Sequence, residues 1–330
     1  MKVDIPNPLL LSIVIPTHNR RVKLTRLIDS IMTSTMPVRD YEIIVVADRC
    51  VDDTVSVLQE RYPHVQCIAS LEPLLSTRAR TLGATHARGR YIFFIDDDNV
   101  VDPQCLVTLV NAMERYPHVG ILGPLMLRYP EGSGIWCAGA VIKRSGMVDH
   151  RNHGPLPIDT AYPDLSTPCD FLPNAFLVQK TLLFQDFPMD PNTFPHNWME
   201  PDIGLHAQRA GYDVRVALQS KVWHDSGYSG YTTRVMLPFI ADQARGRILI
   251  RRRYPEVFAS RLYFWCVFWP ISTVYYLVRF LRDRDLSFRS ALREYFRGTW
   301  YGIKQDISFP MNKCTTIRTT STSEPPSTSR

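Results

Sequence analysis

The sequence predicts an α/β protein whose core is a mainly parallel sheet with helices on both faces. Between residues 9 and 95, short apolar segments with strand character alternate four times with helical segments, as is typical of parallel sheets. The segment 91–95 is a continuous apolar and aromatic run, which indicates a strand buried on both faces. At 330 residues, the chain is long enough to bury a large core.

Each predicted element follows from its local pattern. The apolar strand 9–15 ends at PTHNR, which opens a helix with apolar residues at helical spacing. The strand 41–47 is followed by Asp52 and Asp53, which begin a helix because aspartate favours the positive helix N-terminus. The alternation is completed by a strand at 65–69, a helix at 77–86 and the strand at 91–95.

After residue 100 the alternation continues briefly and then breaks. Residues 126–175 are rich in Gly, Pro and His, and we interpret them as an insertion on the open side of the sheet, where loops commonly carry substrate contacts. The remaining predicted elements are a helix at 103–116, strands at 119–125, 135–142 and 176–179, a helix at 201–210 that Gly211 ends, and a strand at 214–218.

Charge divides the chain into an acidic front and a basic back. Residues before Arg234 include 21 basic and 25 acidic side chains, whereas 17 basic and 7 acidic ones lie from Arg234 onward. The seven cysteines are scattered without a CxxC pair, which argues against a disulfide framework and a zinc site and favours a reducing, cytosolic location. We find no signal-peptide pattern at the N-terminus.

The C-terminal part combines basic and apolar segments. Residues 245–253 are strongly basic, and residues 262–278 form an uncharged run interrupted by Pro270. Because a span needs roughly 20 apolar residues, we predict a helical hairpin or amphipathic pair lying on or dipping into the cytoplasmic leaflet. The alternative is a buried helix of a soluble domain. We therefore predict three regions. They are a first domain at residues 1–233, a membrane-associated region at residues 234–314 and a disordered Ser/Thr/Pro-rich tail at residues 315–330.

Three consecutive carboxylates, Asp96, Asp97 and Asp98, follow the strand 91–95. Ligands of open α/β sheets bind at the carboxyl ends of strands. Adjacent carboxylates suit Mg²⁺ or Mn²⁺, which bind through such oxygens together with substrate phosphates. The alternative is that these residues cap a helix beginning near Pro103.

Six motifs in the expected order resemble the family 2 glycosyltransferases of the GT-A fold. The resemblance covers about residues 10–228 and departs from the family pattern at Ala47, Thr81, Met199, Glu200 and His206. The motifs are PTHNR (16–20), VVADRCVDDT (45–54), ARTLG (79–83), IDDDN (95–99), MEPDIGLHAQRAGYDV (199–214) and VWHDSG (222–227).

The resemblance implies a Rossmann-like α/β/α sandwich with a donor half at about 9–125 and an acceptor half at about 126–233. It implies an inverting transfer of a sugar from a nucleotide-diphosphate donor. UDP is favoured, with dTDP or GDP as alternatives, and the acceptor is a hydroxyl of a lipid-linked saccharide or cell-envelope glycan. Such a reaction must neutralise the diphosphate leaving group and deprotonate the acceptor.

Specific roles can be assigned on this basis. Asp98 would hold the Mg²⁺ or Mn²⁺ ion with help from His224, and Glu200 would be the general base. Arg80 would reach the diphosphate as a charge-assisted donor, although it could instead be a solvated charge on a helix face. The expected nucleotide-binding residues are Pro16, Thr17, Asn19, Arg20, Asp48, Arg80, Asp96 and Asp97.

Two rival functions remain at this stage. IDDDNV also fits the haloacid-dehalogenase type of phosphatase, with Asp96 as nucleophile and Asp98 as acid, although three strand–helix units precede the motif. A non-catalytic carbohydrate- or lipid-binding module is the second. A dehydrogenase is unsupported because no G-x-G-x-x-G follows the first strand.

We expect a cytoplasmic protein that is peripheral or monotopic at the inner face of the cell membrane. It would contact the membrane through residues 245–300, and we expect no nucleic-acid partner.

Overall fold

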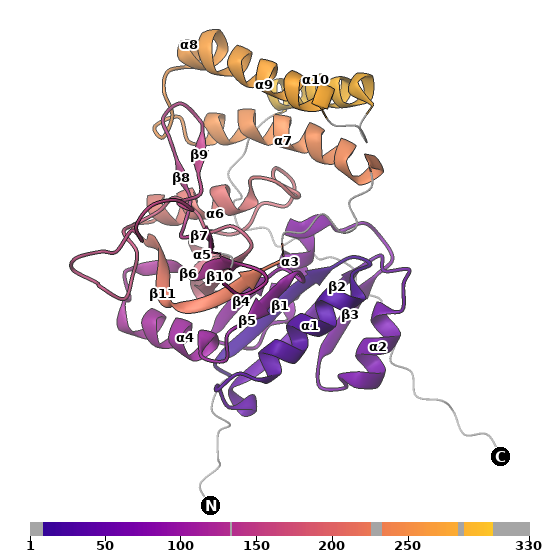
Figure 1. Cartoon of the computed structure of the whole chain (residues 1–330), viewed down its shortest axis with the longest axis vertical. Coiled ribbons are helices and arrows are strands. Elements are labelled where there is room, and N and C mark those ends of the chain that lie inside the picture. The colour runs from indigo at the N-terminus through magenta and orange to yellow at the C-terminus, as the bar shows by residue number, and fades with distance from the viewer. Residues whose placement is uncertain (1–8, 133, 226–232, 283–286, 306–330) are drawn as a thin grey trace, which may run out of the picture.

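A nine-stranded mixed sheet forms the centre of the molecule (Figure 1). The computed structural model describes residues 9–132, 134–225, 233–282 and 287–305. The strand order is β3-β2-β1-β4-β10-β6-β11-β5, and β7 pairs with β6. The strands are β1 (Leu11–Thr17), β2 (Tyr41–Asp48), β3 (Gln66–Ser70), β4 (Tyr91–Ile95), β5 (Asn99–Val101), β6 (Val119–Arg128), β7 (Ile135–Cys137), β10 (Ala175–Gln179) and β11 (Asp213–His224), with a separate hairpin of β8 (Val141–Ile142) and β9 (Val148–Asp149).

The predicted parallel sheet is confirmed for the first half of the chain, where β3, β2, β1 and β4 all run in parallel. Antiparallel pairs appear only after β4, because β10 runs against both β4 and β6, and β5 runs against β11. The helices are η1 (Val38–Asp40), α1 (Arg21–Met32), α2 (Thr54–Arg61), α3 (Leu75–His86), α4 (Cys105–Arg115), α5 (Lys180–Gln185), α6 (Met199–Arg209), α7 (Thr233–Arg253), α8 (Arg261–Tyr263), η2 (Phe264–Phe268), α9 (Trp269–Arg282) and α10 (Phe288–Lys304).

Each face of the sheet carries its own hydrophobic core. Successive strand residues point to opposite faces, so Ile13 and Ile15 pack with α1, α2 and α4, whereas Val14 packs with α3, α5 and α6. The second core also contains Leu249 of α7 and Tyr254, the residue that follows this helix. The first helix of the basic C-terminal part is therefore packed into the same core as the sheet.

Two predicted strands differ from the structure. The single strand expected at 135–142 is wrong, because β7 and β8 are separated by Gly139 at φ +88°. A side chain there would also meet Cys169 Sγ at 2.8 Å, so only glycine fits this turn. The strand expected at 214–218 continues to His224, with an irregularity between Ala217 and Lys221.

The C-terminal part is helical, as predicted. Helix α10 packs along α7 because Gly298 and Gly302 bring its backbone against the carbonyls of Ala241 and Arg245. In Figure 1, α7 lies between the sheet domain and the outer α8, α9 and α10. No helix in the described ranges has both the length and the apolar character required to cross a bilayer. The predicted boundary at residue 233 borders a segment outside the described residues, and the predicted tail at 315–330 lies in another such segment. Both stay predictions.

Candidate functional site

The predicted donor-side residues gather at the carboxyl ends of adjacent parallel strands. Thr17 ends β1, Asp48 ends β2, and the triplet Asp96–Asp98 follows β4. Because β1 lies between β2 and β4, these three chain segments meet at one edge of the sheet. Pro16 lies within β1, opposite Val46 of β2.

Asp97 fastens the end of β4 to the loop after β1. It is 4% exposed and accepts hydrogen bonds from Thr17 Oγ1 at 2.7 Å and Arg20 Nη1 at 3.0 Å. Burial raises the pKa of Asp97 to about 6, although Arg20 opposes this shift. Asn19 adopts φ +53° and accepts the backbone N–H of Val51, which ties the same loop to the end of β2.

Asp98 lies between Arg20 and His224. Arg20 Nη1 lies 3.1 Å from its Oδ2, and His224 Nε2 lies 3.5 Å from its Oδ1. Burial raises the pKa of Asp98, but the hydrogen bond and charge of His224, with Arg20 and Lys23, outweigh it and lower the pKa. Asp98 is therefore the most readily ionised member of the triplet.

The pairing of β11 with β5 places His224 beside Asp98. His224 ends β11 and lies opposite Asn99 in the antiparallel β5 strand, immediately after the triplet. The edge of its ring packs against Trp136, with 4.3 Å between ring centroids. Asp98 Oδ1 is buried, and within the described residues His224 Nε2 is the polar group beside it, 3.5 Å away.

A carboxylate and an imidazole together suit Mg²⁺ or Mn²⁺ when substrate phosphates complete the shell. Within the described ranges, no group of three or more His, Cys, Asp or Glu side chains gathers as a metal site. Asp98 and His224 stay the predicted protein ligands of a metal, and a bound diphosphate would have to supply further ligands.

Arg80 joins the triplet to the predicted base. Its side chain is 1% exposed and pairs with Asp96 through Nη2 and with Glu200 Oε1 through Nη1, the latter at 3.0 Å. Burial lowers the pKa of Arg80, but the two carboxylates outweigh it and raise the pKa. A solvated charge on the helix face, the alternative considered for Arg80, is therefore wrong. A direct contact with the diphosphate stays a prediction.

Glu200 lies in the first turn of α6, where the positive end of the helix favours an acid. The turn begins at Trp198, which has a left-handed φ of +68° and an indole N–H donating to the Gln243 carbonyl. Asp202 points elsewhere, since it accepts two hydrogen bonds from the buried Arg253 of α7. The two acids of this turn thus have different partners, and Glu200 faces the triplet.

Asp48 is held by backbone amides at the entrance to α3. Its two oxygens accept the N–H groups of Leu74 at 2.9 Å and Leu75 at 3.0 Å. It does not cap α2, because Asp52 accepts the N–H of Thr54 there. Base recognition by Asp48 stays a prediction.

Sequence reasoning missed two cations of α1 that lie beside the triplet. Lys23 Nζ and Arg26 Nη2 both contact Asp225 Oδ2, at 3.5 and 2.7 Å, and the Asp225 N–H donates to the Asp98 carbonyl. A sequence signal existed, because Arg20, Lys23 and Arg26 recur every three residues and share one face of the helix.

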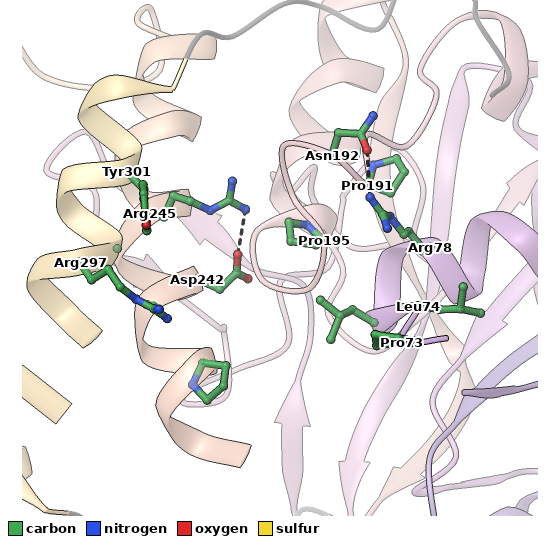
Figure 2. A pocket seen from close by; sticks show the side chains of 14 residues that line it. Pro73, Leu74, Arg78, Pro191, Asn192, Pro195, Asp242, Arg245, Arg297 and Tyr301 are labelled. Atoms are coloured by element: carbon green, nitrogen blue, oxygen red, sulfur yellow. Dashed lines mark hydrogen bonds and ion pairs between the residues drawn. The ribbon is translucent and has the colours of Figure 1, made fainter. Parts of the chain in front are cut away.

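A cavity of about 380 Å³ lies beside the start of α3 (Figure 2). Arg78 and Asn192 come from the sheet domain, whereas Asp242, Arg245 and Tyr301 come from α7 and α10. Arg78 donates to Asn192 Oδ1 at 3.3 Å, and Arg245 pairs with Asp242 at 2.9 Å. The cavity is therefore lined by both the sheet domain and the C-terminal helices. Arg245, one of its cations, already has a counter-charge in Asp242.

Comparison with known sequences gives one family. The model described as glycosyl transferase family 2 matches residues 12–176. A poly(ribitol-phosphate) beta-glucosyltransferase of Bacillus spizizenii is 30% identical over 119 residues, which cover 35% of this chain and 19% of that protein. A GalNAc(5)-diNAcBac-PP-undecaprenol beta-1,3-glucosyltransferase of Campylobacter jejuni is 34% identical over 114 residues, covering 33% of this chain and 36% of that protein. The matched part thus spans well under half the length of these relatives.

Solved structures share the fold at low sequence identity. The structure of GalNAc-T7 with UDP, GalNAc and Mn²⁺ superposes with a TM-score of 0.58 at 17% identity, covering 82% of this chain and 58% of the other. The mannosyltransferase PcManGT from Pyrobaculum calidifontis, in complex with GDP-Man and Mn²⁺, gives 0.52 at 15% identity, covering 91% and 77%. Both support the predicted GT-A architecture.

Proposed function

This chain belongs to glycosyl transferase family 2, and on that premise we propose that it transfers a sugar from a nucleotide-diphosphate donor to a hydroxyl group with inversion. The observation that carries the proposal is the Arg80 bridge. One buried guanidinium holds the donor-side Asp96 and the acceptor-side Glu200, so a donor and an acceptor bound at these two carboxylates would meet between them.

Glu200 acts as the general base in this proposal. It accepts the proton of the acceptor hydroxyl while that oxygen bonds to the anomeric carbon and the bond from this carbon to the diphosphate breaks. One displacement inverts the anomeric carbon, as in inverting glycosidases. Arg80 keeps the Glu200 carboxylate in place without removing its second oxygen from use.

The diphosphate leaves from the opposite side of the site. Asp98 and His224 would hold Mg²⁺ or Mn²⁺, which neutralises the charge that develops on the leaving group. Arg20 holds Asp97 and Asp98 in position. Both solved relatives of this fold contain Mn²⁺ with a nucleotide or nucleotide sugar, which supports a metal in this role.

The nucleotide is proposed to lie across the ends of β1 and β2, near Thr17 and Asp48. UDP is our first choice, with dTDP and GDP as alternatives. The acceptor is proposed to be a cell-envelope glycan or a lipid-linked saccharide, because one relative acts on poly(ribitol-phosphate) and another on an undecaprenol-linked saccharide by their names. Family membership leaves no support for the phosphatase alternative.

The test is calorimetric binding of UDP, GDP and dTDP, each with and without Mn²⁺. We expect one nucleotide to bind the wild type only with Mn²⁺, and we expect Asp98→Asn to lose this binding because a neutral amide is a poor metal ligand. Asp53→Asn is the matched control, since Asp53 is 56% exposed and pairs with Arg21 away from the triplet. Melting curves confirm that each variant is folded. Absence of binding by every nucleotide, or metal-independent binding unaffected by Asp98→Asn, would refute the proposal.

A further inference from the structure

Helix α9 is polar where it is buried and apolar where it is exposed. Ser272 and Thr273 are each 9% exposed, and Thr273 Oγ1 lies 3.0 Å from the Tyr295 hydroxyl of α10. On the opposite side, Ile271, Val274 and Val278 are 65%, 59% and 42% exposed. A helix of a soluble domain normally shows the reverse pattern.

The segment that runs from α8 through η2 to α9 carries a set of exposed apolar side chains. We call this set the apolar face; it consists of Leu262, Trp265, Val267, Ile271, Val274, Tyr275, Val278 and Leu281. The α9 members recur at intervals of three and four residues, so they line one side of the helix. Exposed apolar surfaces of this kind mark contacts with a membrane or a partner.

A cavity of about 680 Å³ adjoins this face. Arg251 and Arg252 of α7 and Arg261 of α8 line it, together with aromatic rings that include Phe264 and Trp265. No aspartate or glutamate is among the described residues that line it. Trp265 belongs both to the cavity wall and to the apolar face, so the two features are continuous.

Arg251 is the central cation of the cavity. Its guanidinium carbon lies 4.7 Å from the ring centroid of Phe258 and 4.3 Å from that of Phe264, and Nη2 donates to the Ala259 carbonyl at 2.8 Å. Nη1 is buried without a hydrogen-bond partner. Burial lowers the pKa of Arg251, and no carboxylate among the described residues raises it. A bound anion would supply the missing counter-charge and hydrogen bond.

Arg252, which also lines the cavity, forms no ion pair with the carboxylates of the described residues. Within that part of the chain, Arg252 Nη1 donates to backbone carbonyls near the end of α10, including Gln305 O at 2.6 Å. This differs from the cavity of Figure 2, where Arg245 pairs with Asp242. The 680 Å³ cavity thus combines unneutralised positive charge with apolar walls.

We propose that the cavity binds the phosphate group of an anionic membrane lipid while the apolar face rests in the interfacial region of the bilayer. A lipid matches both features, because its phosphate complements the arginines and its hydrocarbon complements the adjoining face. A second copy of the chain fits less well, since pairing two such faces would bring the arginines of both cavities together. This inference does not depend on the proposed sugar transfer.

The test uses the full chain in a vesicle-sedimentation assay. One set of vesicles contains phosphatidylcholine alone and the other contains phosphatidylcholine with phosphatidylglycerol. We expect tighter binding to the anionic vesicles. Arg251→Gln should lower that affinity by roughly fivefold, the usual effect of one basic residue near an anionic surface, and should leave the weaker binding to neutral vesicles unchanged.

Two further variants separate the contributions. Val274→Asn combined with Val278→Asn should weaken binding to both kinds of vesicle, because it removes exposed apolar contacts without altering charge. Arg39→Gln is the control for total charge, since Arg39 is 86% exposed on η1. Melting curves and calorimetric nucleotide binding check that each variant is folded with an intact nucleotide site, so a failure here is distinguishable from a failure of the proposed transferase.

Three outcomes would overturn the inference. The first is equal binding to neutral and anionic vesicles. The second is an equal loss of binding in Arg251→Gln and Arg39→Gln, which would indicate a diffuse effect of net charge. The third is that the protein does not bind vesicles and that light scattering shows a dimer, which dissociates in the Val274→Asn, Val278→Asn variant. That result would assign the apolar face to a second copy of the chain.

Discussion

Replacing Arg253 with methionine should destabilise the protein severely. The Arg253 side chain is 1% exposed. Its Nη1 donates to both oxygens of Asp202, at 3.0 and 2.9 Å, and its Nη2 donates to Asp190 at 2.6 Å. Tyr254 donates a further hydrogen bond to Asp202. One buried cation therefore neutralises two buried carboxylates and links α7 to α6.

The size of the effect follows from what the variant leaves behind. Methionine fills much of the volume of the arginine stem, so little cavity is created, but Asp190 and Asp202 lose their counter-charge. Breaking a buried pair in this way costs about 3–5 kcal/mol. Domains are stable by only about 5–15 kcal/mol. Arg253→Met should thus remove at least about a fifth of the free energy of unfolding.

Urea unfolding followed by circular dichroism measures this loss. The matched control is Arg252→Met on the same helix, because Arg252 donates to backbone carbonyls and leaves no charge unpaired. Its expected cost is about 1 kcal/mol. If Arg253→Met proved no less stable than this control, the argument from unpaired buried carboxylates would fail.

The penalty should also depend on pH. In the wild type, burial raises the pKa of Asp202 to about 6, whereas for Asp190 burial is outweighed by the hydrogen bonds of Arg253 and Thr193, which lower the pKa. Loss of Arg253 should raise both folded-state pKa values, so that both lie above the unfolded value of about 3.9. The folded variant then binds more protons than the unfolded chain. Its stability therefore falls as the pH rises from the unfolded-state pKa to the folded-state pKa of these aspartates. Each group contributes up to about 1.4 kcal/mol per pH unit. The difference from wild type should therefore be smaller at pH 5 than at pH 7.5.

Two further predictions concern the base and the C-terminal helices. Glu200→Gln keeps an oxygen for Arg80 but cannot accept a proton, so the rate of transfer should fall on the order of 10²–10⁴-fold. Nucleotide affinity, measured by calorimetry, should not change. A wild-type rate would exclude Glu200 as the base. A chain ending at residue 234 should fail to fold because it lacks Leu249 and Tyr254 of the shared core, whereas a chain ending at residue 305 should fold, and circular dichroism with limited proteolysis compares the two.

Sequence patterns were sufficient to predict that the proposed donor-side residues lie together, because their positions follow from strand order. Once parallel strands were predicted, Thr17, Asp48 and the Asp96–Asp98 triplet had to meet at their carboxyl ends. His224 reached the same place through the antiparallel pairing of β11 with β5, and the resemblance rather than periodicity indicated it. The resemblance likewise indicated Glu200, because no local pattern identifies the distant partner of a helix-terminal acid.

The Arg80 bridge could not be derived from local sequence. Spacing along α3 shows which residues share a helix face, but it does not show what covers that face. The loop before α6 packs on the first turn of α3, where Thr77 Oγ1 donates to the Phe194 carbonyl. Arg80, one turn along the same helix, is 1% exposed and pairs with two carboxylates. The distinction between a solvated and a buried arginine was therefore a tertiary property.

The run Arg251, Arg252 and Arg253 shows why composition misleads in the C-terminal part. Consecutive residues point about 100° apart on a helix, so the three guanidinium groups enter three environments. Arg253 meets two carboxylates, Arg252 meets the carbonyls at the end of α10, and Arg251 meets aromatic rings. The first charge is neutralised inside the protein and contributes to the fold, whereas the other two remain available to an external anion. The number of acidic partners, rather than the number of arginines, decides which part of this basic segment can bind a lipid phosphate.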